Sequence, residues 1–329
     1  MVPFPRHRWE RNHETEGVDA DPLLERVVAE GLIEPPAALV VMLSGGRDSV
    51  CMLDLAVRAR GAGEMAVLHV NYGLREGASE DESFCVELCA QLGAELTVER
   101  PVRPEGAGNL QAWARDSRYA AAARLAAARE ATVVTGHTAD DQVETILYRL
   151  ASSPSRRALL GMKPRDGQLA RPLLGTTREE TTAYCERHGL GWREDPSNAE
   201  PTYARNRIRA GLLPELARVH PAAAANVLRT ASLLRDEAEV LDALVTTELD
   251  GSGEAPRGAI TQARLRELQP ALARLVVQRL ADAAAGRPVP GAGNHAEQVA
   301  GLRQGGAMLD LGGGVRALLE HGVIRAERP

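Results

Sequence analysis

The segment of this 329-residue chain whose residue types point most directly to chemistry is Ser44-Gly45-Gly46-Arg47-Asp48-Ser49. An apolar run precedes it and a helical pattern follows, and a glycine turn at such a junction aims backbone N–H groups and the helix dipole at one anion. The Gly-Lys-Ser/Thr ending of a Walker A loop is absent. Asp48 would repel a bound phosphate unless its charge is offset, which indicates Mg²⁺ nearby. The alternative is an ordinary strand-to-helix turn with an Asp or Ser cap.

A second polar cluster reads Gly136-His137-Thr138-Ala139-Asp140-Asp141-Gln142-Val143-Glu144-Thr145. On a helix, Glu144 shares a face with Asp140 and Asp141, because side chains three and four positions apart are neighbours. Such carboxylates can hold Mg²⁺ or orient an amine nucleophile, and His137 can serve as a base or as an orienting group. Thr138 and Asp141 also fit a capping box, in which Asp141 mainly stabilises the helix start.

Three further segments carry polar side chains that could contact a substrate. One is His69-Val70-Asn71-Tyr72-Gly73-Leu74-Arg75, another is Arg118-Tyr119, and the third is Arg205-Asn206-Arg207-Ile208-Arg209. Guanidinium groups bind phosphate bidentately and keep their charge, so the arginine-rich run predicts a positive patch. The alternatives are a simple turn at residues 71–73 and solvated helix faces at the arginines.

These segments sit between elements that alternate along the chain. The continuous apolar run at 37–43 predicts a buried strand, and the segments 65–70, 95–98 and 132–135 also predict strands. The stretches 50–60, 79–92, 110–128 and 140–150 predict helices. Strands that alternate with helices of these lengths predict an α/β fold with a doubly wound parallel sheet. Ligands of such sheets bind at the carboxyl ends of the strands, where the polar clusters fall.

The remaining chain predicts a second, smaller domain. Residues 1–20 lack a periodic pattern and predict a mobile leader, residues 21–218 form the α/β domain, and residues 219–329 form a mainly helical domain. Within the last of these, helices are expected from about 221 to 248 and at 262–284, and the tail at 308–326 predicts two short strands.

Composition restricts the class of protein. The chain is 44% hydrophobic with a net charge of −6, which argues against nonspecific nucleic-acid binding over the whole surface. No apolar run approaches the roughly 18 residues of a membrane helix, and the first ten residues lack the apolar core of a signal peptide. We therefore expect a cytoplasmic protein with no membrane partner. The four cysteines form no CxxC pair and predict buried free thiols.

The motifs together resemble a known family. Residues 44–49 match the SGGxDS signature of the PP-loop ATP pyrophosphatases, and residues 136–145 resemble the GHTADDQxET motif of tRNA(Ile)-lysidine synthetases. The segments HVNYGLR, EDPSN, RNRIR and LLPEL are similar to that family's pattern over residues 38–220. Two departures are Tyr72, where a His is usual, and residues 152–158, where a glycine-rich stretch is usual.

The resemblance implies an adenine-nucleotide α-hydrolase-like fold and a tRNA-recognition role for the C-terminal domain. It implies that ATP adenylates C2 of cytidine 34 in the CAU anticodon of tRNA(Ile), and that L-lysine then displaces AMP. It leaves the oligomeric state open, a dimer included. The implied sites are ATP-binding Ser44, Gly45, Gly46, Arg47, Asp48, Ser49, His69 and Gly136; catalytic Asp48, His137, Asp140, Asp141 and Glu144; Mg²⁺-binding Asp48 and Asp141; and tRNA- or substrate-binding Asn71, Arg75, Arg118, Tyr119, Arg205, Asn206, Arg207 and Arg209.

Two other functions stay open at this point. A tRNA 2-thiolation enzyme of the same superfamily would need paired CxxC cysteines for a cluster, or a reactive cysteine, and the spacing of Cys51, Cys85 and Cys89 does not favour it. A PP-loop protein that binds nucleotide or RNA without turnover draws support from the two departures. The intact motifs at 44–49 and 140–144 oppose it.

Overall fold

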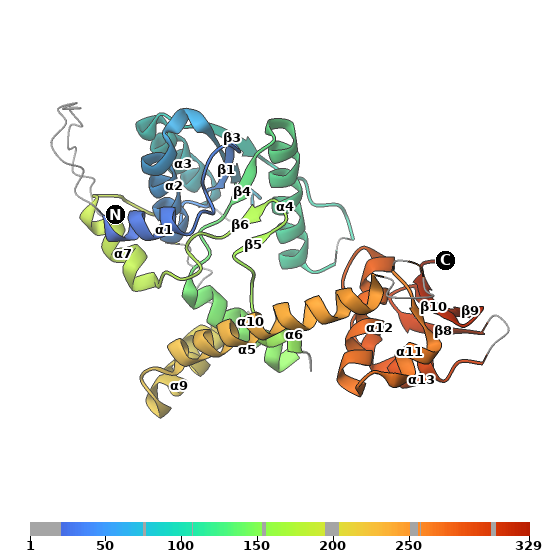
Figure 1. The fold of residues 1–329 in the computed structure, drawn as a ribbon. Helices are drawn as coiled ribbons and strands as arrows, with labels where there is room; N and C mark the ends of the chain where they lie inside the picture. Colours follow the sequence, from blue (N-terminus) through green and yellow to red (C-terminus); the bar gives the residue numbers. More distant parts are fainter. Residues whose placement is uncertain are drawn as a thin grey trace. The chain divides into compact units, whose positions relative to one another are not determined.

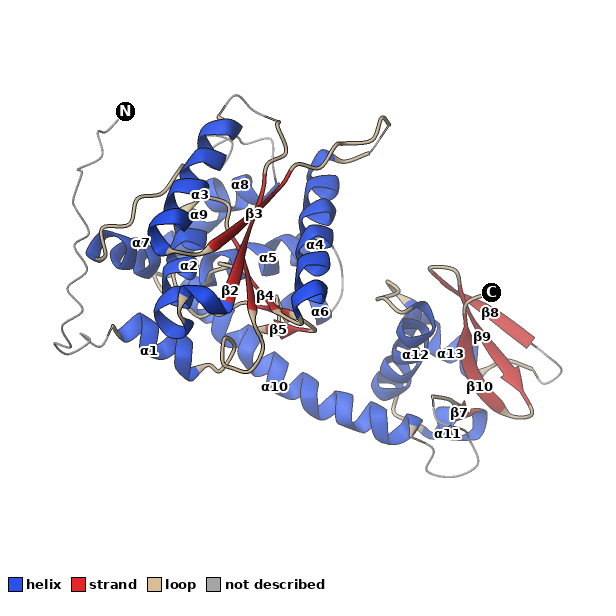
Figure 2. Cartoon of the chain, turned by 90° about the horizontal axis from the view of Figure 1, so that it is seen from above, coloured by secondary structure: helices blue, strands red, loops and turns tan. Residues whose placement is uncertain are grey.

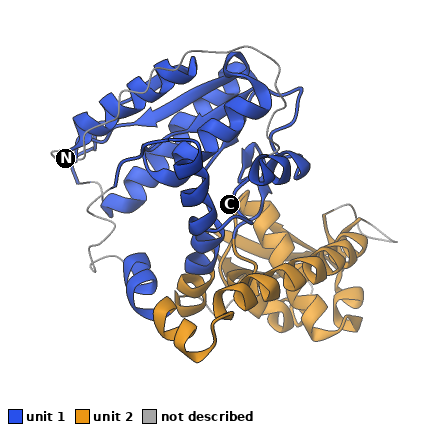
Figure 3. Ribbon diagram, turned by 90° about the vertical axis from the view of Figure 1, so that its left-hand side faces the viewer, with its two compact units in different colours: residues 1–145, 162–212 blue, residues 146–161, 213–329 orange. Residues whose placement is uncertain are grey.

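The chain forms two compact units. A computed structural model describes residues 21–74, 77–106, 108–152, 156–194, 204–250, 256, 258–303 and 307–329. The first unit comprises Met1–Thr145 and Met162–Leu212, and the second comprises Ile146–Gly161 and Leu213–Pro329 (Figure 3). The expected leader lies outside the described residues, and the expected domain boundary after residue 218 stays a prediction.

A mostly parallel sheet forms the centre of the first unit. Its order is β3-β2-β1-β4-β6-β5, in which only β5 runs antiparallel to its neighbour. In the register, Leu39 of β1 lies between Met65 of β2 and Thr132 of β4. This arrangement confirms the expected doubly wound sheet. The strands are β1 (Leu39–Met42), β2 (Met65–Val70), β3 (Glu95–Glu99), β4 (Thr132–Val134), β5 (Arg165–Asp166) and β6 (Leu169–Ala170).

Helices follow the strands as the sequence predicts, and the helix after β1 starts earlier than expected, at Arg47. This helix ends at Gly61, whose φ of 81° suits a glycine. The helices of the first unit are α1 (Pro22–Ala29), α2 (Arg47–Arg60), α3 (Ala78–Leu92), α4 (Leu110–Arg129), the start of α5 (Ala139–Ser152), α7 (Arg178–Arg187) and α8 (Ala204–Arg207), with short helical turns at Ala62–Glu64 and Ile208–Leu212.

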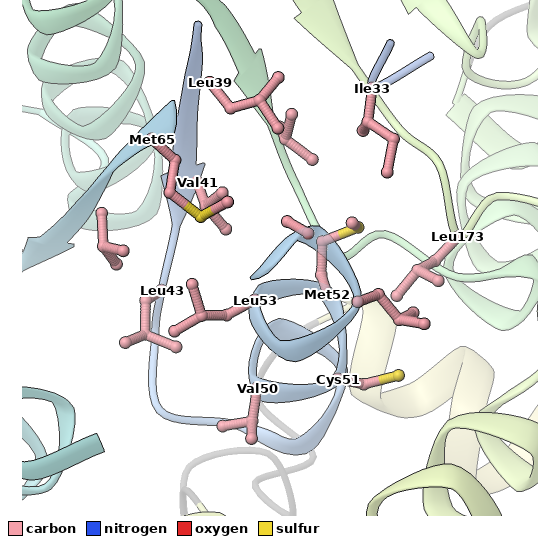
Figure 4. Close-up of a cluster of buried hydrophobic side chains, with 14 of the residues drawn as sticks. Ile33, Leu39, Val41, Leu43, Val50, Cys51, Met52, Leu53, Met65 and Leu173 are labelled. Atoms are coloured by element: carbon pink, nitrogen blue, oxygen red, sulfur yellow. The ribbon is translucent and has the colours of Figure 1, made fainter. Parts of the chain in front are cut away.

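The two faces of the sheet bury different side chains, because successive residues of a strand point to opposite faces. Leu39, Val41 and Leu43 pack with α2 in one core, and Figure 4 shows them beside Val50 and Leu53. The alternate residues of β1 pack on the other face, against alanines of α4. Figures 1 and 2 accordingly show α4 on the opposite side of the strands from α2 and α3. Two buried layers fix the position of β1 and of the loop that follows it.

The second unit combines helices with an antiparallel sheet of order β7-β10-β9-β8. Its apolar core joins α12 to strands β9 and β10. The elements are α6 (Arg156–Leu159), α9 (Leu213–Val219), α10 (Ala223–Leu249), β7 (Ile260–Thr261), α11 (Gln262–Glu267), α12 (Pro270–Ala285), a turn at Ala292–His295, α13 (Ala296–Ala300), β8 (Ala307–Gly312), β9 (Val315–Glu320) and β10 (Val323–Glu327).

Two expectations for this unit were wrong in detail. The helix expected over 262–284 is interrupted at Leu268 and Gln269, both extended, because Pro270 starts a new helix and disfavours helical geometry in the residue before it. The tail contains three strands rather than two, since glycines with positive φ at positions 312–314 and 322 turn the chain twice. No helix among the described residues is long and apolar enough to cross a membrane.

Candidate active site

A pocket of about 820 Å³ lies where the chain leaves the central strands. The connection from β1 leads to β2 on one side of the sheet, whereas β4 leads towards β6 on the other side. Such a reversal of strand order leaves a crevice at the carboxyl ends of the strands, where α/β proteins bind ligands. The lining includes the loop after β1, the residues after β4, Asp141 of α5 and Arg178 of α7.

The loop after β1 is closed by its own hydrogen bonds. Ser49 Oγ donates to the carbonyl of Gly46 at 2.7 Å and accepts from the backbone N–H of Ser44 at 3.2 Å. The two serine hydroxyls lie 3.1 Å apart, and the N–H of Gly46 points at Ser44 Oγ at 3.4 Å. Gly45 has a φ of 84°, which a side chain would strain, and its carbonyl accepts from the N–H of Arg193 at 2.9 Å. These contacts hold the loop in the curved form that an anion site needs.

Gly136 brings the end of β4 against the first turn of α2. A β-carbon at this position would lie 2.5 Å from the carbonyl oxygen of Asp48 and 3.0 Å from the nitrogen of Ser49. Both are backbone atoms, which cannot rotate away. Gly136 lines the pocket beside the loop, and the close approach explains why this position lacks a side chain.

Three carboxylates from two sequence motifs surround the guanidinium of Arg178. Its Nη2 lies 3.0 Å from Asp141 Oδ1, its Nη1 lies 3.1 Å from Glu144 Oε1, and its Nε lies 3.9 Å from Asp48 Oδ2. Asp140, which the sequence also places among the catalytic residues, instead accepts from the backbone N–H of Arg178 at 2.8 Å. Asp140 thereby holds the start of α7, and the other three carboxylates form the acidic part of the site.

Asp141 combines both roles that the sequence leaves open. Its Oδ2 accepts from the N–H of Thr138 at 2.9 Å and from the Thr138 hydroxyl at 3.2 Å, so this oxygen caps the start of α5. Its Oδ1 pairs with Arg178. The capping contacts fix the rotamer that presents the second oxygen to the pocket.

The arginine-rich run at 205–209 contributes to the same cluster. Arg209 donates twice to the carboxylate of Glu144, from Nε at 2.7 Å and from Nη2 at 3.1 Å, and Glu144 is only 1% exposed. Arg205 donates to Thr145 Oγ1 at 3.4 Å. Arg209 therefore lies on the pocket lining rather than on a solvated face. Asn206 and Arg207 also have interaction partners and do not line the pocket.

The two histidines lie in different surroundings. His137 lines the pocket, with its Nδ1 2.7 Å from Thr135 Oγ1. Burial, together with nearby Arg171 and Arg118, lowers the pKa of His137 to about 4, so the ring is uncharged at neutral pH. His69, expected among the ATP-binding residues, is 5% exposed and donates from Nδ1 to the carbonyl of Leu43 at 2.9 Å. This hydrogen bond holds Leu43, the residue that precedes the loop, and places His69 in a structural position.

The segment after β2 is divided between a turn and the pocket. The side chain of Asn71 accepts from the N–H of Gly73 and donates to Glu82 at 2.8 Å, which stabilises the turn. Tyr72 lines the pocket, but its hydroxyl donates to the carbonyl of Ala114 at 2.8 Å and is thus engaged with α4. Arg75 lies outside the described residues. Arg118 and Tyr119 of α4, both expected to bind substrate, line the pocket.

The residues present fit a Mg²⁺ ion that arrives with a nucleotide. Among the described residues, no group of three or more His, Cys, Asp or Glu side chains is placed to hold a metal. Mg²⁺ in phosphate sites needs only one or two carboxylates, the remaining ligands being phosphates and water. Asp48 lines the pocket, and its Oδ2 has only the 3.9 Å contact with Arg178. Both oxygens of Asp141 are already engaged, which makes Asp48 the better ligand.

Comparison with known proteins identifies the family. A model of the PP-loop domain matches residues 21–216. A tRNA(Ile)-lysidine synthase of Salinispora tropica is 35% identical over 93% of this chain and 96% of its own length. The chain belongs to the tRNA(Ile)-lysidine synthase family. The synthase of Symbiobacterium thermophilum is 37% identical, and the match covers 93% of this chain and 69% of that protein. For the synthase of Geobacter sulfurreducens, 38% identical, the match covers about half of its length, 51%.

A solved structure supports the fold beyond the lysidine synthase family. The U34-tRNA thiolase NcsA from Methanococcus maripaludis has a TM-score of 0.54 and 17% sequence identity, with 65% of this chain and 78% of that chain covered. At this identity the similarity concerns the fold alone, which is the PP-loop arrangement of a parallel sheet with flanking helices.

Arg178 contacts three carboxylates of this lysidine synthase-family site, but the sequence motifs did not identify it. It occupies the first position of α7, after the N-cap Thr177 and beside Glu179 and Glu180. The helix dipole disfavours a cation at the start of a helix, so an arginine at this position is consistent with a nearby anion. That conflict is the one sequence signal that could have pointed to Arg178.

Proposed function

We propose that the chain joins L-lysine to C2 of cytidine 34 in the CAU anticodon of tRNA(Ile), with ATP converted to AMP and pyrophosphate. One observation carries the proposal: a chain of the tRNA(Ile)-lysidine synthase family brings the anion-binding loop, the carboxylates of Asp48 and Asp141 and a neutral histidine into one pocket. A tRNA substrate and ATP imply that the protein acts in the cytoplasm.

The reaction requires two displacements. The C2 oxygen of cytidine 34 attacks the α-phosphorus of ATP, an O–P bond forms, and the bond to the β-phosphate breaks with release of pyrophosphate. The amine of lysine then attacks C2, the C–O bond to the adenylate breaks, AMP leaves and the amine loses a proton. Each displacement develops negative charge on a leaving phosphate, so fixed N–H donors and cations are the groups that accelerate it.

The residues of the pocket match these needs. The backbone N–H groups of Gly45, Arg47 and Asp48, between the loop and the first turn of α2, would hold the leaving pyrophosphate. Asp48 would hold Mg²⁺, which neutralises phosphate charge when it is bound with ATP. Asp141 and Glu144 would attract the lysine amine, and Arg178 and Arg209 fix their positions. His137, uncharged because of its lowered pKa, can accept the proton that the amine loses.

The cysteines favour ligation over thiolation. All four are buried and free. Burial raises the pKa of the Cys85 and Cys89 thiols to about 12, so neither forms the thiolate that sulfur transfer or cluster binding requires.

Pyrophosphate release tests the proposal directly. ATP, Mg²⁺, L-lysine and an unmodified tRNA(Ile) transcript with a CAU anticodon are added singly and together, and incorporation of labelled lysine into the tRNA is followed. We expect release only with the tRNA, and incorporation only with all components. A transcript with uridine at position 34 is the matched control. Nucleotide binding without pyrophosphate release, or equal activity on both transcripts, would refute lysidine synthesis.

A further inference from the structure

The pocket lining and the residues beside it contain buried polar side-chain atoms that lack a well-formed hydrogen bond. Across the described part of the chain, three buried side-chain nitrogen or oxygen atoms are in this position: Arg118 Nε, Tyr119 Oη and Arg171 Nε. Buried polar atoms in proteins are nearly always hydrogen-bonded, and exceptions often mark a site for another molecule.

The three side chains form a single cluster next to His137. The guanidinium carbon of Arg118 lies 5.5 Å from the centre of the Tyr119 ring, and Arg171 interacts with Tyr119 electrostatically and through a weak side-chain hydrogen-bonding contact. Arg118 and Tyr119 line the pocket, and Arg171, only 5% exposed, lies behind them. The guanidinium carbon of Arg115 stacks on the same tyrosine ring at 4.9 Å. We call Arg118, Tyr119 and Arg171 the α4 cluster.

The α4 cluster differs from the other arginines of the pocket in its charge balance. Arg178 and Arg209 are paired with Asp141 and Glu144. In the part of the chain that the structure describes, neither arginine of the α4 cluster has a carboxylate within 4.0 Å. The charges of Arg178 and Arg209 are therefore balanced by carboxylates, whereas the positive charge of the α4 cluster would be neutralised by a bound anion.

We propose that the α4 cluster binds the α-carboxylate of the L-lysine substrate. The inference rests on the proposed ligation of lysine, whose substrates offer three kinds of oxyanion: the ATP phosphates, the tRNA phosphates and this carboxylate. The ATP phosphates already have the donors of residues 44–49. An arginine fork and a tyrosine hydroxyl match the two oxygens of a carboxylate. Arg118 Nε and Tyr119 Oη are buried atoms of residues that line the pocket, which favours a small molecule that enters the pocket over a tRNA phosphate at its rim.

With this assignment, one end of the pocket is positively charged and the other end carries carboxylates, which matches the opposite charges at the two ends of lysine. The carboxylate end of lysine contacts the α4 cluster, and the amine end extends towards Asp141 and Glu144. Both groups of residues belong to the first compact unit, and Arg118, Tyr119 and Asp141 line the same pocket. A consequence is selection against amines that lack a carboxylate.

L-lysinamide is the probe that isolates the carboxylate, because it retains both amines and replaces the charged group by a neutral amide. We would measure kcat/KM for L-lysine and for L-lysinamide with the wild-type enzyme, Arg118→Gln and Tyr119→Phe. Arg124→Gln is the matched control, since this arginine lies on α4 but pairs with Glu99 at the surface. Unfolding curves and tRNA-dependent pyrophosphate release without lysine report whether each variant keeps its fold and its adenylation step.

We expect the wild type and Arg124→Gln to prefer lysine over lysinamide by about 10- to 100-fold, the range of one charge-assisted hydrogen bond. Arg118→Gln should reduce kcat/KM for lysine by a similar factor and reduce kcat/KM for lysinamide and pyrophosphate release much less, so that the preference for lysine narrows. A preference that survives in both variants would overturn the assignment. A raised KM for tRNA with weaker pyrophosphate release would do so as well, because the cluster would then hold a tRNA phosphate. Absence of lysine incorporation by the wild type would instead refute the proposed function.

Discussion

Replacement of Gly136 by alanine tests how closely β4 must approach the loop of the site. The added carbon would lie 2.5 Å from Asp48 O, 2.8 Å from Asp48 C and 3.0 Å from Ser49 N. All three atoms belong to the backbone of the first turn of α2, so no side-chain rotation relieves the contact. Ordinary contact begins at 3.4 Å, and the two segments must therefore separate by about 0.9 Å.

Two losses of different size should follow. Overpacking of a rigid region costs about 1–3 kcal/mol of the free energy of unfolding. A displacement near 1 Å at a reacting centre lowers activity by about 100-fold, because the reacting groups leave their aligned positions. Asp48 and His137 flank the contact, so we expect Gly136→Ala to lose activity more severely than stability.

Urea unfolding and pyrophosphate release measure the two losses separately. Gly63→Ala is the control, since its β-carbon meets nothing within 4 Å in the turn before β2. A Gly136→Ala variant with wild-type stability would show that the two segments separate without cost. Full activity in a destabilised variant would refute the claim that their spacing positions the reacting groups.

Three other substitutions test single contacts of the site. Glu144→Gln should lower the free energy of unfolding by about 3 kcal/mol, because the guanidinium groups of Arg178 and Arg209 lose a carboxylate partner that is only 1% exposed. A loss below about 1 kcal/mol would contradict this. The pKa of His137 is lowered from 6.5 to about 4 in the folded protein, so as the pH falls the unfolded chain binds a proton first. Between pH 6.5 and 4 the wild type should therefore lose more free energy of unfolding than His137→Gln does. Parallel pH curves for the two proteins would contradict this. Tyr72→Phe should lower the free energy of unfolding by about 1 kcal/mol, because the hydrogen bond to the carbonyl of Ala114 is lost, and should affect kcat less. A large fall in kcat at unchanged stability would instead indicate a catalytic role for the hydroxyl.

The sequence predicted the parts of the site that depend on strand order. A continuous apolar run identified β1 as a buried strand, and the alternation of strands with helices identified β4. Parallel strands bring the residues that follow them to one edge of the sheet. This is why Ser44–Ser49 and His137 were correctly expected to be neighbours, although about 90 positions separate them in the sequence. Helical spacing likewise placed Asp141 and Glu144 on one face, and both contact Arg178.

Contacts made by side chains from irregular segments could not be predicted in this way. The position of Arg178 depends on how the connection at residues 171–177 after β6 folds, and no periodicity describes that connection. His69 carries a residue type suited to catalysis, but the alternation of β2 turns it towards Cys85 of α3, whose sulfur lies 3.4 Å from its Nδ1. The α4 cluster became visible only as three atoms without partners, a property that requires coordinates.

The closed loop at residues 44–49 has a consequence for the free energy of nucleotide capture. Its serine hydroxyls, the Gly46 backbone and the bond from Arg193 to Gly45 fix the dihedral angles of the loop when the chain folds. Ordering one residue costs about 1–2 kcal/mol of conformational entropy, and here that cost falls on folding rather than on ligand capture. On this basis we expect the loop to add little to the entropic cost of nucleotide binding.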